Sequence, residues 1–160
     1  MKEIREAQRK WRKAKALAGR KCFEDGNVGM AKKLSDCAMF TGDETLEQMV
    51  GMMFSAKGAE FLTRFGFPDI ETFRKFIKYE PDRLGVYIDK GEISLRSVKN
   101  IFAVGNTIVR AKCDETALYR IIAMHGASVH AEASGYAVVK VEKDAFSNVE
   151  VSKNDNAKVL

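Results

Sequence analysis

Hydrophobic and small residues recur with a period of ten from residue 107 onward. Each repeat has a small residue, an apolar residue two positions later, and a further uncharged residue two positions after that. The three series are Thr107, Ala117, Ala127, Ala137, Ser147 and Ala157; Val109, Tyr119, Val129, Val139, Val149 and Val159; and Ala111, Ile121, Ala131, Val141 and Val151. Turn-forming residues, among them Gly105, Gly126 and Gly135, separate the repeats. Each repeat therefore predicts a short strand with alternate side chains facing inward, followed by a tight turn.

Two architectures fit a strand every ten residues. In a flattened β-solenoid, two repeats make a coil of about 20 residues, and like positions stack in register. In an antiparallel β-meander or sandwich, successive strands reverse, so the small residue would alternate between the two ends. The constant residue size within each series favours the solenoid. We expect residues 101–107 to start the stack and helices to cover its edge, because a bare strand edge invites aggregation.

The earlier part of the chain has helical spacing instead. We predict an α+β protein with a helical region at 1–80 and a β-ladder at 81–160, packed as one unit. Helices are expected at 1–21, 28–40, 44–55, 56–65 and 69–80, with Asn27 and Asp43 as N-caps, Gly66 as a stop and a restart at Asp69. The segment 85–95, "GVYIDKGEISL", alternates apolar residues around a turn and is typical of a hairpin.

Positive charge is concentrated at the N-terminus. Residues 1–21 hold nine Lys or Arg against two Glu, a local net charge of +7, whereas the whole chain carries +5. On a helix, Ile4 and Trp11 would lie on an apolar face, with the cations on the opposite face. A solvated basic face is the simpler interpretation. A surface for nucleic acid or an acidic partner is the functional one, with Arg5, Arg9, Arg12, Lys13 and Arg20 as its candidate residues.

The outward positions of the repeat give a second set of candidate contacts: Arg110, Arg120, His130 and Lys140, followed by Glu150. With two strands per coil, Arg110, His130 and Glu150 would share one face, and Arg120 and Lys140 the other. Residues 101–160 contain seven basic and seven acidic groups. Mutually compensated charges are therefore favoured over a phosphate-binding groove.

The sequence offers no catalytic constellation, so we predict a non-enzymatic protein without cofactor or metal. His125 and His130 flank a turn and do not form a zinc-binding pair, and Cys113 has no motif that would orient it as a nucleophile. Three widely spaced cysteines indicate neither disulfides nor zinc, which favours a cytoplasmic location. No apolar run approaches the ~20 residues of a membrane-spanning helix.

Three stretches, "MMFSAKGAEFLTRFGFPDIETFRKF", "LGVYIDKGEISL" and "AMHGASVHAEASGYAVVKVEKD", carry a resemblance to other proteins. Together they resemble small uncharacterised proteins of gut-bacterial phages and mobile elements, in which a helical front precedes an Ala/Val ladder. The resemblance implies a context in which small proteins bind host machinery, with nuclease inhibitors of the anti-CRISPR kind as one class. It implies no activity and no site residues.

Three hypotheses for function follow. The first is a phage-type binding protein, in the host cytoplasm, that inhibits a nucleic-acid-targeting defence enzyme through a host protein or nucleoprotein partner. The second is a nucleic-acid-binding accessory protein that acts through the basic N-terminal helix. The third is a structural or virion protein that forms oligomers through the edge of the β-ladder.

Overall fold

The computed structural model describes all residues, 1–160, and these form two compact units. The first unit comprises Met1–Met49 and the second Val50–Leu160. Helices occupy the chain up to Leu84 and strands begin at Val86, close to the predicted change at residue 80. The boundary between the compact units falls earlier, within a helix. The packing of the helical and strand regions as one unit stays a prediction.

The first unit is built on α1 (Lys2–Glu24) and α2 (Val28–Asp36), which pack against each other. As predicted, Asn27 caps α2, since its side-chain oxygen accepts a hydrogen bond from the Met30 amide at 3.2 Å. The helix ends earlier than the predicted residue 40. The chain after Asp36 becomes extended, and the Phe40 ring lies edge-on against Trp11 with centroids 5.8 Å apart.

The third helix, α3 (Leu46–Phe54), starts with a cap that the sequence interpretation misplaced. Asp43 is not the cap, because Thr45 Oγ1 accepts from the Gln48 amide at 3.1 Å and Gln48 Oε1 accepts from the Thr45 amide at 2.9 Å. This reciprocal pair is a capping box. The Asp43 carboxylate instead lies 3.6 Å from the Arg5 guanidinium.

Two further helices and two 3-10 turns precede the strands. Ser55 caps the helix α4 (Ala56–Phe65), and a left-handed Gly66 stops this helix, as predicted for Gly66. Asp69 caps α5 (Ile70–Arg74), but the helix predicted over 69–80 is shorter. The backbone tightens into 3-10 geometry and continues as η1 (Ile77–Tyr79) and η2 (Pro81–Leu84).

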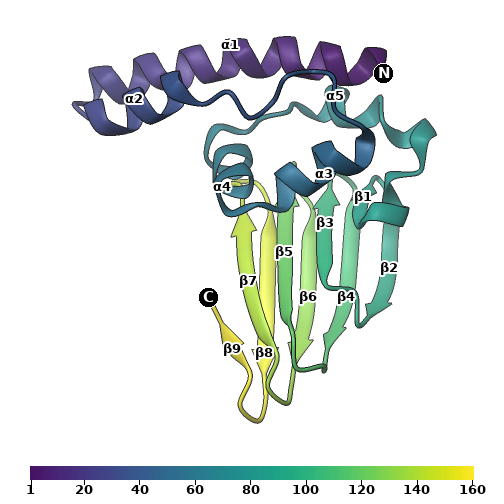
Figure 1. Cartoon of the computed structure of the whole chain (residues 1–160). Coiled ribbons are helices and arrows are strands. Elements are labelled where there is room, and N and C mark those ends of the chain that lie inside the picture. Colours follow the sequence, from purple (N-terminus) through teal and green to yellow (C-terminus); the bar gives the residue numbers. More distant parts are fainter. The chain divides into compact units, whose positions relative to one another are not determined.

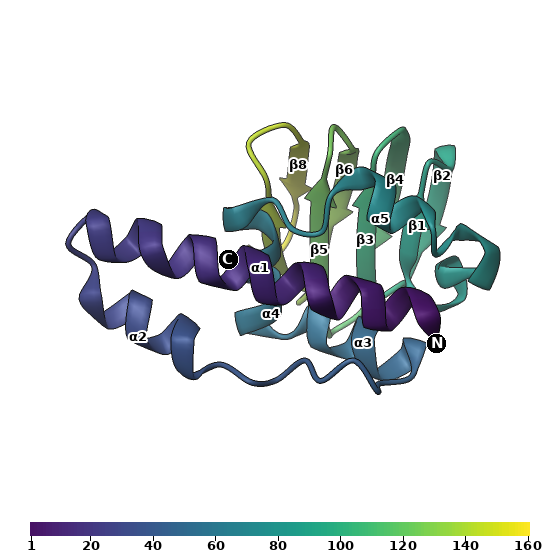
Figure 2. The same ribbon diagram turned by 90° about the horizontal axis from the view of Figure 1, so that it is seen from above.

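The remaining chain winds into a β-solenoid with two parallel sheets (Figures 1 and 2). Sheet A has the order β1-β3-β5-β7-β9 and sheet B the order β2-β4-β6-β8. Their strands are β1 (Val86–Ile88), β2 (Gly91–Arg96), β3 (Asn100–Val104), β4 (Thr107–Cys113), β5 (Leu118–Met124), β6 (Ser128–Ala133), β7 (Val138–Lys143), β8 (Asn148–Lys153) and β9 (Lys158–Val159). Val109 pairs with Val129, which pairs with Val149, so each coil takes 20 residues. The predicted solenoid is confirmed, and the antiparallel alternative is wrong.

The first coil is shorter than the rest and starts earlier than predicted. Val86 pairs with Phe102 and Ile93 with Val109, a spacing of 16 residues. The stack therefore begins at Val86 and not at residue 101. The hairpin predicted over 85–95 is also wrong, because β1 and β2 belong to different sheets. A hairpin and a solenoid corner share the same local pattern, and only the distant pairing partner distinguishes them.

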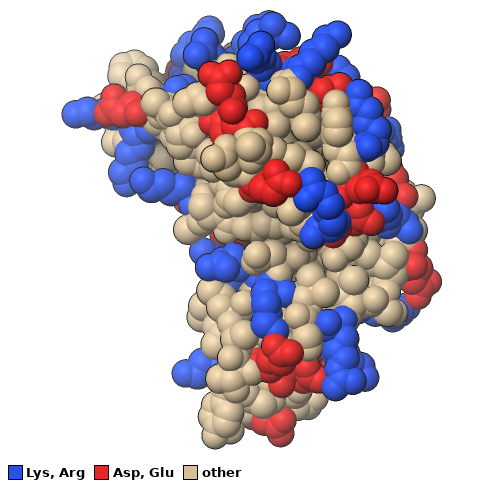
Figure 3. All heavy atoms as spheres, turned by 45° about the vertical axis from the view of Figure 1, so that its right-hand side comes forward, with Lys and Arg blue, Asp and Glu red and all other residues tan.

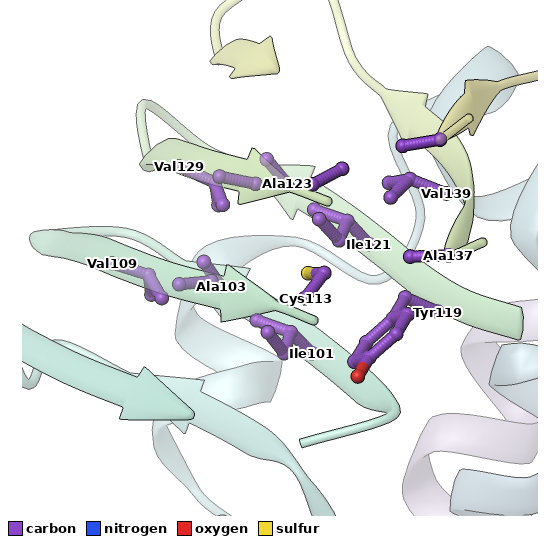
Figure 4. Packing of buried hydrophobic residues seen from close by; sticks show 14 of the residues in the cluster. Ile101, Ala103, Val109, Cys113, Tyr119, Ile121, Ala123, Val129, Ala137 and Val139 are labelled. Carbon is purple, nitrogen blue, oxygen red and sulfur yellow. The ribbon is translucent and has the colours of Figure 1, made fainter. Parts of the chain in front are cut away.

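Most odd-numbered residues of the later strands fill an apolar interior between the sheets (Figure 4). Tyr119, Ile121, Val129 and Val139 are fully buried there. The packing thins at the last coil, where Val149 and Val151 are half-buried. Ala127, Ala137, Ser147 and Ala157, the quartet of small residues, are all buried, which confirms the stacked interpretation of the period.

The corners of the coils are joined by aspartates that accept hydrogen bonds from the neighbouring coil. The three pairs are Asp89 Oδ1 with the Asn106 amide at 2.9 Å, Asp144 Oδ2 with the His125 amide at 2.8 Å, and Asp155 Oδ2 with the Gly135 amide at 3.0 Å. Asp144 is itself buried. The Arg74 guanidinium, which donates to Asp89 at 2.8 Å, lowers the pKa of that carboxyl. These contacts fix each turn to the coil beside it.

Part of the outer face of sheet A forms a second apolar layer. Phe102, Val104, Ile122 and Met124 point outward by their register, yet all four are buried. The rings of Phe54 and Phe73 lie against Phe102, with centroids 6.1 and 5.5 Å apart. The helix α4 contacts β5 and β7, and η2 contacts β1. Helices therefore cover the β1 edge, as predicted, and additionally cover this part of the sheet's face.

Candidate functional surfaces

The first candidate surface is the exposed side of α1. Ile4, Ala7, Trp11 and Ala18 are buried along one side of the helix. The predicted contact residues, Arg5, Arg9, Arg12, Lys13 and Arg20, are all exposed on the opposite side. Figure 3 shows lysine and arginine side chains gathered at the top of the view, where α1 lies. The helix thus presents a single basic side, as its sequence predicts.

Most of these cations have no carboxylate beside them. Arg5 lies 3.6 Å from Asp43, an exposed pair, but no carboxylate lies within ion-pair distance of Arg9, Arg12, Lys13 or Arg20. With a rise of 1.5 Å per residue, the side chains from Arg9 to Arg20 extend over about 16 Å along the helix. The basic side of α1 is therefore a continuous and largely uncompensated strip of charge.

The second candidate surface is the outer face of sheet B. Arg110, His130 and Glu150 are neighbours in register, as predicted. They line an open hollow of about 670 Å³ together with residues of the next row, which include Arg96 and Glu132.

Several charges of this face are compensated in pairs. Arg110 Nε lies 2.8 Å from Glu92 Oε1, His130 Nδ1 3.3 Å from Glu150 Oε2, and Arg96 2.9 Å from Asp114. In Figure 3, basic and acidic side chains also lie next to one another on the part of the solenoid in view. The predicted mutual compensation of charges is confirmed for Arg110, whereas Glu150 balances a charge on His130 only when the imidazole is protonated.

The third candidate surface is the outer face of sheet A. Arg120 and Lys140 are direct neighbours on β5 and β7, as predicted from the period. Neither has an ion-pair partner, so the compensation predicted for the whole ladder does not extend to them. Sequence reasoning also missed three neighbours on this face, Leu118, Val138 and Lys158. These recur at intervals of twenty, so a search at twice the period would have found them.

The residues considered for catalysis face three different environments. His125 occupies a corner, where its Nε2 atom is 2.7 Å from the Pro68 carbonyl oxygen and its ring packs on Phe73. His130 faces outward from sheet B, whereas Cys113 faces the solenoid interior and is fully buried. Burial raises the pKa of the Cys113 thiol to about 11. A neutral, enclosed thiol of this kind is a packing group.

Other kinds of site give no further candidates. The residues contain no group of three or more His, Cys, Asp or Glu side chains that could hold a metal ion. None of the helices combines the length and the apolar character that crossing a membrane requires. Comparisons of the chain with protein families, with curated proteins and with solved structures found no match.

Proposed function

We propose that the protein is a non-enzymatic binding protein that contacts nucleic acid through the basic side of α1. The observation that carries the proposal is the uncompensated strip of charge formed by Arg9, Arg12, Lys13 and Arg20. An arginine without a carboxylate partner gains more from a phosphate than one that already has an ion pair. Each phosphate contact also releases condensed counterions, which favours binding at low salt.

The packing of α1 supports a role as a recognition surface. Because Ile4 and Trp11 anchor the opposite side of the helix, the cations are held on one side and do not have to be gathered on binding. The basic residues are spread along the helix axis, which suits the phosphates of a strand or a groove edge. Arginine and lysine side chains bind phosphates whatever the base sequence, so the expected binding is independent of sequence.

The proposal is tested by fluorescence anisotropy with a labelled duplex and a labelled single strand over a range of salt concentrations. The test variant carries Arg9→Gln, Arg12→Gln and Lys13→Gln. We expect the affinity for duplex at low salt to fall at least about tenfold, and the salt slope to become shallower by about 3. The matched control carries Lys112→Gln, Lys143→Gln and Lys153→Gln, which remove the same charge from exposed positions of the solenoid.

The two variants separate a specific surface from overall charge. The control is expected to bind within about twofold of the parent protein, because its substitutions leave the α1 strip intact. Equal losses in the two variants would show that only the net charge matters. A parent protein that binds neither nucleic acid at low salt would reject the proposal outright.

A further inference from the structure

The outer face of sheet A carries a small patch whose charges are not balanced by the protein itself. The patch consists of Leu118 and Arg120 on β5, Val138 and Lys140 on β7, and Lys158 on β9. Arg120 and Lys140 stand side by side on strands about 4.8 Å apart. Like charges directly opposite each other destabilise a sheet. The two cations have no ion-pair partner that would offset this cost.

The equivalent positions on the other sheet show what a self-contained surface looks like. There Arg110 is paired with Glu92, and His130 with Glu150. Both sheets are built from the same repeat, so the lack of partners on sheet A belongs to its particular residues and not to the fold. An anionic group supplied by another molecule would offset the repulsion between Arg120 and Lys140.

The neighbouring rows define what else the ligand must contain. Two residues before the cations along each strand, Leu118 and Val138 are apolar neighbours, Leu118 is 38% exposed, and Lys158 on β9 follows Val138 in the same row. Two residues after Lys140, Glu142 lies on the same face. Along β7 the outward residues therefore run apolar, basic and acidic, with a spacing of about 6.6 Å between rows, whereas β5 has the buried Ile122 beside Glu142.

We propose that this patch binds an extended peptide segment of a protein partner. Alternate side chains of an extended peptide have the same spacing as the rows, so the peptide would run along β5 and β7. Its acidic side chain lies between Arg120 and Lys140, and an apolar side chain two residues away lies on Leu118 and Val138. A basic side chain two residues to the other side of the acidic one faces Glu142.

Nucleic acid fits the patch less well than such a peptide. A phosphate backbone needs a track of positive charge, and here Glu142 interrupts the track immediately beyond Lys140. The apolar row formed by Leu118 and Val138 would also lie against a charged backbone, which gains nothing from it. The inference is thus independent of the nucleic-acid surface on α1 and concerns a different class of partner.

The test uses a blocked peptide with the core Leu-Thr-Glu-Thr-Lys and a charge-swapped control with the core Leu-Thr-Lys-Thr-Glu. The two have the same composition and net charge. We expect a dissociation constant of about 1 mM, so each peptide is titrated into the full chain to a concentration several times higher. Binding is followed by NMR of the backbone amides. We expect saturable shifts confined to the region of residues 118–120 and 138–142, with the swapped peptide binding at least about fivefold more weakly.

Variants of the protein complete the test. Arg120→Gln with Lys140→Gln should abolish the shifts without lowering the melting temperature, because the substitutions relieve a repulsion. Arg110→Gln with Lys112→Gln, the matched pair on sheet B, should leave peptide binding unchanged, and so should the α1 variant. Absence of saturable shifts, equal binding of both peptides, or undiminished binding to the Arg120/Lys140 variant would each overturn the proposal. Displacement of the peptide from these residues by a twelve-nucleotide oligothymidine at lower concentration would overturn it in favour of nucleic acid.

Discussion

The stacking of the solenoid makes a quantitative prediction for one residue type at one repeat position. Valine occupies this position at 109, 129, 139, 149 and 159. Val109, Val129 and Val139 are fully buried, Val149 is half-buried and Val159 is 41% exposed. Replacing each valine with alanine removes the same atoms from five environments. Differences in the loss of unfolding free energy therefore reflect differences in burial.

The magnitudes follow from the buried share of each side chain. Valine to alanine removes two methyl-sized groups, worth about 0.8 kcal/mol each when buried, and leaves a cavity that adds to the cost. We expect about 2–3 kcal/mol for each of the three fully buried valines. For Val159, whose 41% exposure leaves little more than half of the side chain buried, the transfer cost falls to about 1 kcal/mol or less, and no closed cavity forms. Val149 should be intermediate.

The costs can be measured by urea denaturation followed by circular dichroism at a strand-sensitive wavelength. Midpoints are compared at constant denaturant slope, so that a changed slope flags a changed unfolding reaction. The expected order is Val129 and Val139 above Val149, and Val149 above Val159. Equal costs at all five positions, or the largest cost at Val159, would refute the packing of the solenoid interior as described.

Three further predictions concern other parts of the chain. Phe40→Ala removes the ring beside Trp11 and should destabilise the first unit by about 3 kcal/mol, with a red shift in the emission of this single tryptophan; unchanged emission would contradict the packing. Asp144→Ala leaves the His125 amide and one further turn amide without an acceptor, at a cost of about 1–3 kcal/mol and with faster hydrogen exchange at both amides. Between pH 9 and 11 the unfolded chain loses the Cys113 proton before the folded chain does, so stability should fall more steeply through this window in the parent than in Cys113→Ala, where the raised pKa values of Tyr87 and Lys99 still contribute; equal slopes in thermal melts at each pH would contradict this.

The repeat part of the fold could be predicted from the sequence because every coil places the same side chains in the same environment. Small residues such as Ala127 and Ser147 recur at the same position because they lie at stacked corners. There the neighbouring coils leave no room for a larger side chain. The first coil could not be predicted in this way, because its 16 residues break the period. Its turn at Asp89 also satisfies the local rules of a hairpin, and the choice between the two depends on a strand that comes later in the chain.

The helix caps illustrate a different limit of sequence reasoning. Asn27 is a correct prediction, since it precedes the first turn of its helix with no competitor. At α3 the segment contains both Asp43 and Thr45, and either residue type can cap a helix. The presence of Gln48 three residues after Thr45 decides between them, because it completes the reciprocal hydrogen bonds.

The sequence predicts where the candidate surfaces lie, but it does not predict what they bind. Register alone puts Arg120 beside Lys140 and Arg110 beside His130, as the period predicts. Whether a cation finds a partner depends on rotamers and on residues from other repeats, such as Glu92, that the period does not relate to it. The inhibitor of a host defence enzyme, implied by the resemblance, and oligomer formation through the open ladder edge both stay predictions.

A single row of sheet A shows how one repeat yields both a core and an exposed surface. Phe102, Ile122 and Glu142 are successive neighbours in register on β3, β5 and β7. Phe102 and Ile122 are buried beneath helices of the same unit, whereas Glu142 carries a charge. Burying the Glu142 carboxylate without a partner would cost more free energy than the apolar contacts would contribute. A helix layer extended over Glu142 is therefore unfavourable. The adjacent row, with Arg120 and Lys140, remains open for the same reason, since a cover would have to supply two carboxylates. The residues that end the helix layer are thus the ones that leave the proposed peptide-binding patch accessible.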